Sequence, residues 1–132
     1  MDTERIEDVV DRLSKEDRFD WVGVYLVDSD TLVLGPFRGQ DPAGHERIPV
    51  GEGVCGAVAA SGETEVVPDV NARPGHIQCF IGTRSEVVAP IVRDGSVVGV
   101  LDVDSDTPDA FGEDQVRLVE EAAAEIAAGV LD

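Results

Sequence analysis

Two cysteines, Cys55 and Cys79, are the only thiols in the chain, and each lies in a segment suited to a site. Cys55 stands among closely spaced glycines where a loop is expected to turn into a helix, and Cys79 follows a Pro-Gly turn that carries His76. Glycines let a backbone approach a ligand closely, and a thiol near a helix N-terminus or a cation ionises more readily. The pair suggests redox chemistry. The alternative stays equally open here, because free cysteine often acts as a small buried hydrophobe.

Carboxylates of the expected strands could act in a reaction at these thiols. Asp102 and Asp104 are two apart on one strand and therefore share a face, and Glu86 begins the strand before it. A carboxyl that burial keeps protonated could donate a proton to a departing oxygen, whereas an ionised one could bind an ammonium group. In so acidic a chain, acids at strand ends could equally belong to the surface. Trp21 and Tyr25 also share a strand face, as ordinary core aromatics do.

The same thiols permit a metal-site interpretation. Two cysteines and both histidines, His45, Cys55, His76 and Cys79, can be written as a Cys2His2 set. Their spacing is not that of any compact zinc motif. We therefore expect neither a metal nor another cofactor.

The charge of the chain excludes some partners. Acidic residues number 28 against 10 basic ones, a net charge of −18, and the acids are dispersed rather than clustered. Nucleic-acid binding requires clustered Lys and Arg, so we expect none. So many acids repel one another, and this repulsion is tolerable when salt screens it, with a screening length of about 3 Å at 1 M. The composition therefore suggests a protein of a salt-accumulating (halophilic) organism. With no signal peptide and no membrane-length apolar run, we expect a cytoplasmic protein, where cysteines favour catalysis, redox sensing or metal binding over a permanent disulfide.

Periodicity predicts one α+β domain over residues 1–132, built on an antiparallel sheet. The expected elements are a helix over 1–14, strands over 21–27 and 31–36, a helix over 53–60, strands over 65–67, 85–92 and 96–104, and a helix over 114–131. Segments 37–49 and 70–83 are expected to be long loops. We expect the terminal helices to pack together on one sheet face. The loops and the short helix would cover the other face and enclose a small-ligand pocket.

Seven short stretches of the chain follow one another in a recognisable order and spacing. They are residues 20–27, 32–37, 47–49 with 53–56, 66–70, 74–77 with Cys79, 84–86, and 99–105. Together they resemble the GAF domain, and more specifically the free methionine-(R)-sulfoxide reductases, which are single GAF domains. One position departs from the pattern, because His45 stands where the family commonly has a third, often resolving, cysteine.

The resemblance implies an activity, the thiol-dependent reduction of free methionine-(R)-sulfoxide through a cysteine sulfenic acid and a disulfide. Cys79 matches the attacking thiol, with His76 and Arg84 as cationic neighbours in the sequence. Cys55 is the internal thiol that could resolve the sulfenic acid, and the sequence leaves open whether the two roles are exchanged.

The resemblance also implies which residues bind the substrate. Glu86, Asp102 and Asp104 match the carboxylates of the pocket, where they would serve both binding and proton transfer. Trp21 and Tyr25 match aromatics that wall the pocket around the methylsulfinyl group, a role that suits their apolar rings.

Two functions from different classes remain. The first is an enzyme recycled by thioredoxin or a small thiol, with a homodimer through the terminal helices by family analogy. The second is a non-catalytic GAF module that binds a small ligand or senses redox state, having lost turnover with the third cysteine. The carboxylates and the two remaining thiols favour the enzyme.

Overall fold

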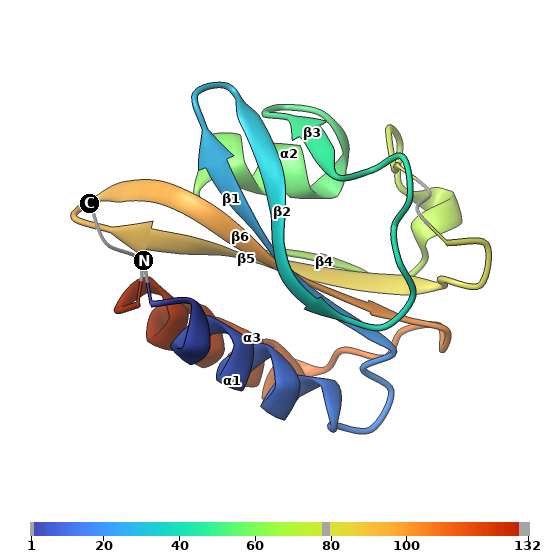
Figure 1. Cartoon of the computed structure of the whole chain (residues 1–132). Coiled ribbons are helices and arrows are strands. Elements are labelled where there is room, and N and C mark those ends of the chain that lie inside the picture. The colour runs from blue at the N-terminus through green and yellow to red at the C-terminus, as the bar shows by residue number, and fades with distance from the viewer. Residues whose placement is uncertain (1, 78–79, 130–132) are drawn as a thin grey trace.

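The computed structural model describes residues 2–77 and 80–129, and its elements follow the predicted order (Figure 1). They are α1 (Thr3–Ser14), β1 (Trp21–Asp28), β2 (Thr31–Arg38), β3 (Arg47–Pro49), α2 (Gly53–Ser61), β4 (Glu65–Val67), the 3-10 helix η1 (Val70–Ala72), β5 (Ser85–Arg93), β6 (Ser96–Ser105) and α3 (Glu113–Ala127). The fold class is α+β, as predicted.

The two expected loops contain short elements that the sequence did not reveal. Within 37–49, β2 continues to Arg38 and β3 pairs with residues 31–33 of β2, and within 70–83 lies η1. Each of the two added elements is three residues long. The loop assignment of these residues was wrong, because an element of three residues shows no periodicity from which it could be predicted.

The described strands form one antiparallel sheet in the order β3-β2-β1-β6-β5-β4. The β5–β6 hairpin turns at Asp94 and Gly95, which both have positive φ, 52° and 80°. That backbone is a primed turn, which an Asp-Gly dipeptide favours and whose twist matches the twist of the strands it joins. The hairpin places the start of β5 beside the end of β6.

The terminal helices lie side by side on one face of the sheet (Figure 1), as expected. Their apolar stripes meet alternate residues of the central strands, and the buried set includes Ile6, Val10 and Leu13 of α1, Val119 and Ile126 of α3, and Val22, Val24, Leu101 and Val103 of the sheet. Among the described residues, no helix is both long enough and apolar enough to cross a bilayer.

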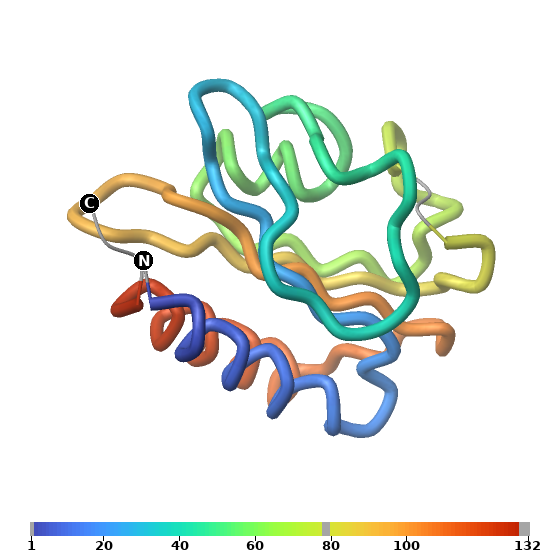
Figure 2. Tube along the Cα trace, viewed as in Figure 1, coloured from blue at the N-terminus to red at the C-terminus, as the bar shows by residue number. Residues whose placement is uncertain are grey.

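The opposite face carries α2 and the segments around residues 39–46 and 68–77, which can be followed in Figure 2. Side chains of β1 alternate between the two faces, so Val22 and Val24 contact the helices while Trp21 and Tyr25 point toward α2. A second buried cluster therefore forms on this side, and the predicted site residues belong to it or border it.

Candidate functional site

The three predicted carboxylates lie together on the α2 face of the sheet. Glu86 is opposite Asp104 across β5 and β6, and Asp102 is two residues from Asp104 on the same face. Only 5% of Glu86, 5% of Asp102 and 6% of Asp104 is exposed. Buried carboxylates of this kind are costly unless they are paired or protonated, so the surface interpretation of these acids is excluded.

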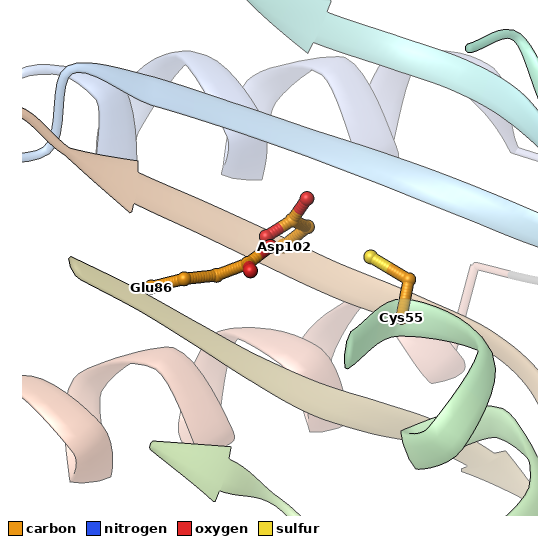
Figure 3. Close-up of side chains that lie close together, drawn as sticks. All are labelled: Cys55, Glu86 and Asp102. Carbon is orange, nitrogen blue, oxygen red and sulfur yellow. The ribbon is translucent and has the colours of Figure 1, made fainter. Parts of the chain in front are cut away.

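Cys55 approaches these carboxylates from the first turn of α2 (Figure 3). Its Sγ and one carboxylate oxygen each of Glu86 and Asp102 all lie within 4.8 Å of one another. We call these three residues the Cys55–Glu86–Asp102 group. Among the described residues, it is the one group of three or more side chains whose atoms lie close enough together to hold a metal ion. Neither His45 nor His76 of the Cys2His2 alternative joins this set.

Glycines hold α2 in this position. A Cβ on Gly56 would lie 2.6 Å from the carbonyl oxygen of Pro49, and one on Gly53 would lie 2.7 Å from the Cδ1 of Ile77. The amide of Gly51 donates to the carbonyl of Gly56 at 2.8 Å. The glycines that the sequence analysis associated with a ligand thus let neighbouring parts of the chain approach one another and seat Cys55.

Electrostatics shift the pKa values of the facing carboxyl groups in opposite directions. Burial, followed by the negative charge of Glu86, raises the pKa of Asp104 well above its ordinary value. Burial opposes ionisation of Glu86 as well, but hydrogen bonds from Asp102, His76 and Asp104 hold the pKa of Glu86 below its ordinary value. Of the two facing carboxyl groups, Asp104 therefore holds its proton to a higher pH than Glu86 does.

The expectation that Cys55 ionises readily is wrong. Burial, and then the charges of Asp102, Glu86 and Asp104, raise the pKa of the Cys55 thiol well above its ordinary value. Three neighbouring acids outweigh the favourable effect of a helix N-terminus, so Cys55 is a protonated thiol at neutral pH.

The remaining predicted polar residues have different positions. His76 lies against Glu86, with Nε2 3.4 Å from Oε1. Arg84 is exposed, and His45 is half-buried, with its carbonyl accepting from the Tyr25 hydroxyl at 3.0 Å. Cys79 lies outside the described residues.

Four aromatic rings belong to the buried cluster that contains Cys55 or pack against it, and two of them, Phe37 and Phe80, were not predicted. Trp21 stacks on Phe37 at 5.8 Å and contacts Phe80 at 5.7 Å and Tyr25 at 6.4 Å between ring centroids. The indole lies over Gly23, where an added Cβ would be 2.2 Å from the ring. An isolated glycine in an apolar strand is a signal of such close approach and could have revealed this packing.

The space beside Cys55 is small. The cavity measures about 20 Å³ and is lined by Ile48, Gly53, Ile77 and the Cys55–Glu86–Asp102 group, among others. That volume accommodates roughly one water molecule. An amino-acid-sized ligand is therefore larger than this cavity.

Comparison with known protein sequences identifies relatives of this chain. The GAF domain family model matches residues 3–130. GAF domain-containing protein A of Dictyostelium discoideum is 45% identical over 109 residues, 82% of this chain and 68% of that protein. The free methionine-R-sulfoxide reductase of Escherichia coli is 40% identical over 106 residues, 80% of this chain and 63% of that enzyme.

Comparison with solved structures finds the same kind of enzyme. The free methionine-R-sulfoxide reductase of Neisseria meningitidis, solved in complex with its substrate, superposes with a TM-score of 0.90 and is 41% identical. The match covers 96% of this chain and 76% of that one. The chain spans between 48% and 68% of the length of five curated relatives.

Proposed function

Since the chain belongs to the GAF domain family and, within it, to the free methionine-(R)-sulfoxide reductases, we propose that it reduces free methionine-(R)-sulfoxide to methionine at the expense of thiols. The observation that carries the proposal is the buried set of Glu86, Asp102 and Asp104 around Cys55. Sulfoxide reduction requires a proton donor for the departing oxygen, an anion for the substrate ammonium and a thiol nearby, and this arrangement supplies all three.

Two of the carboxyl groups have different roles, proton donation and ammonium binding, because their pKa values are shifted in opposite directions. Asp104, whose pKa is raised by burial and by the charge of Glu86, is the proton donor to the sulfoxide oxygen. Glu86, whose pKa is held low despite its burial, binds the substrate ammonium. Trp21 and Tyr25 surround the methylsulfinyl group with apolar surface.

The two thiols act in sequence. The thiolate of Cys79 attacks the sulfoxide sulfur while the oxygen takes up two protons and leaves as water, and this attack joins Cys79 to the methionine sulfur through an S–S bond. Water then attacks the Cys79 sulfur, the S–S bond breaks, methionine leaves, and Cys79 becomes a sulfenic acid as one proton passes to solvent. The Cys55 thiol then attacks the sulfenic sulfur, forming a disulfide and releasing water. The raised pKa of Cys55 disfavours it as the first nucleophile, and in the second step its proton leaves with the sulfenic oxygen as water.

An external thiol must return the disulfide to two thiols. The proposed reductant is thioredoxin or a small thiol, and the proposed compartment is the cytoplasm, where such reductants keep thiols reduced. The family analogy also extends to a homodimer through α1 and α3.

The test is substrate discrimination in the presence of dithiothreitol, with methionine quantified by chromatography. We expect reduction of the free (R) epimer and little reduction of the (S) epimer or of N-acetylmethionine sulfoxide. The acetylated compound lacks the ammonium that Glu86 would bind, and losing a charged partner in a buried site is heavily penalised. Equal rates on the free and acetylated substrates would contradict the proposal. Tight binding of the free (R) epimer without methionine formation would establish the ligand-binding module instead.

A further inference from the structure

The Cys55–Glu86–Asp102 group has the composition of a metal site as well as of a catalytic one. A thiol sulfur and two carboxylate oxygens, all within 4.8 Å of one another, converge from α2, β5 and β6 (Figure 3). Thiolate and carboxylate are both ligands of Zn²⁺. Because the ligands come from three elements far apart in the sequence, no short spacing motif could have revealed them.

A second observation points to a cation at this place. Asp104 has a buried Oδ1 that lacks a hydrogen-bond partner among the described atoms, and its side chain lies on the same strand face as Asp102. A buried carboxyl oxygen left unsatisfied is costly. His76 contacts Glu86, while Asp102 and Asp104 are buried on the same face of the sheet. The cluster thus gathers three buried acids beside a single imidazole.

We propose that the Cys55–Glu86–Asp102 group binds a thiophilic divalent cation of the Zn²⁺ class, and that the bound cation occupies the place of the substrate ammonium. Tetrahedral zinc, with bonds of about 2.0–2.3 Å, needs its ligand atoms closer together than 4.8 Å. The three side chains therefore have to rotate toward one another when the cation binds. On binding, the Cys55 S–H bond is replaced by an S–metal bond and the proton passes to solvent.

The fourth coordination position is available to His76 or to water. Nε2 of His76 is 3.4 Å from Oε1 of Glu86, so it lies beside one of the proposed ligands. The cation site stands on geometry and is independent of turnover. Its consequence, reversible inhibition of the enzyme by zinc, rests on the proposed function, because it requires that the same pocket bind the substrate.

Cobalt(II) is the probe that tests the site, because a thiolate bound to cobalt gives a near-ultraviolet charge-transfer band that carboxylates alone do not give. The titration uses the full chain carrying Cys79→Ser, in which Cys55 is the only thiol. We expect the band to saturate at a single cobalt ion per protein. Adding Cys55→Ser must abolish the band, and zinc must displace the cobalt.

Carboxylate variants show whether the acids are ligands. Asp102→Asn should weaken cobalt binding by about tenfold or more, the range found when partners of a metal site are lost. Asp28→Asn, at an exposed strand end, is the matched control and should leave the affinity unchanged. Circular dichroism and the melting temperature establish that each variant is folded. A missing band, or equal affinities for the Asp102 and Asp28 variants, would overturn the site.

Turnover assays separate this proposal from the previous one. Wild-type protein that forms methionine but shows no thiolate-to-cobalt band refutes the cation site and leaves the reductase intact. Protein that shows the band but never forms methionine, with or without added zinc, refutes the reductase and leaves the cation site intact.

Discussion

Replacing Gly23 by alanine should disturb the aromatic wall of the site from within the sheet. The added Cβ would lie 2.2, 2.6 and 2.9 Å from three carbons of the Trp21 ring. Carbon atoms pack at about 3.5 Å or more, so the indole has to withdraw by roughly 1.3 Å. Phe37, stacked on it at 5.8 Å, and the hydrogen bond from Trp21 Nε1 to the Gln40 carbonyl at 2.8 Å both resist that movement.

The expected loss of stability follows from these contacts. Overpacking a core typically costs about 1–3 kcal/mol, and a weakened hydrogen bond adds about 1 kcal/mol. The reduced backbone entropy of the unfolded alanine variant offsets about 0.5–1 kcal/mol. The free energy of unfolding should therefore fall by roughly 2 kcal/mol, and the KM for the free sulfoxide should rise, because Trp21 no longer holds its place.

The assay is urea unfolding in molar potassium chloride, with Gly82→Ala as the control. A Cβ on Gly82 meets the nearest atom, Oδ1 of Asp106, at an ordinary 3.5 Å, so that variant should change stability by less than about 0.5 kcal/mol. In a Trp21→Ala background the penalty of Gly23→Ala should disappear, because no ring remains to be displaced. Equal effects of Gly23→Ala in the two backgrounds would refute the reasoning.

Three further predictions concern charge. With 28 acidic and 10 basic residues, the melting temperature should rise between dilute buffer and molar potassium chloride; a salt-independent value would remove the halophile interpretation. Because burial and the charge of Glu86 raise the pKa of Asp104, stability contributed by its protonated form is lost as the pH rises from about 4 through the raised pKa. Asp104→Asn should therefore stabilise the fold at neutral pH, with the gain vanishing near pH 4 in parallel urea titrations, while methionine formation falls; a pH-independent difference would contradict this. Arg12→Gln removes the largely exposed ion pair with Glu125 that joins α1 to α3, and should lower the free energy of unfolding by less than about 1 kcal/mol; a much larger loss would show a role beyond this pair.

The order of the main helices and strands could be predicted because their signals are local. The Asp94-Gly95 dipeptide favours the turn of one hairpin, and the spacing of Trp21 and Tyr25 assigned both to one face of β1. β3 could not be predicted, because its three residues become a strand only through pairing with β2. Pairing between distant segments leaves no periodic trace in so short a stretch.

The site could be predicted in its residues but not in its contacts. The spacing of Asp102 and Asp104 fixed a shared face, yet the register that brings Glu86 opposite Asp104 is a property of the folded hairpin. The protonated state of Cys55 was missed for the same reason, because the acids that raise its pKa are more than thirty residues away along the chain.

A single-turnover measurement tests the central claim most directly. Fully reduced protein is mixed with one equivalent of free methionine-(R)-sulfoxide without external thiol, and methionine and intact protein mass are determined together. The account predicts one methionine per chain and a mass lower by two hydrogens, since Cys55 and Cys79 become a disulfide. Cys79→Ser should form no methionine, whereas Cys55→Ser should form it and retain a sulfenic acid. Methionine from Cys79→Ser but not from Cys55→Ser would reverse the assigned roles, and methionine formation that is unchanged in both variants would contradict thiol catalysis altogether.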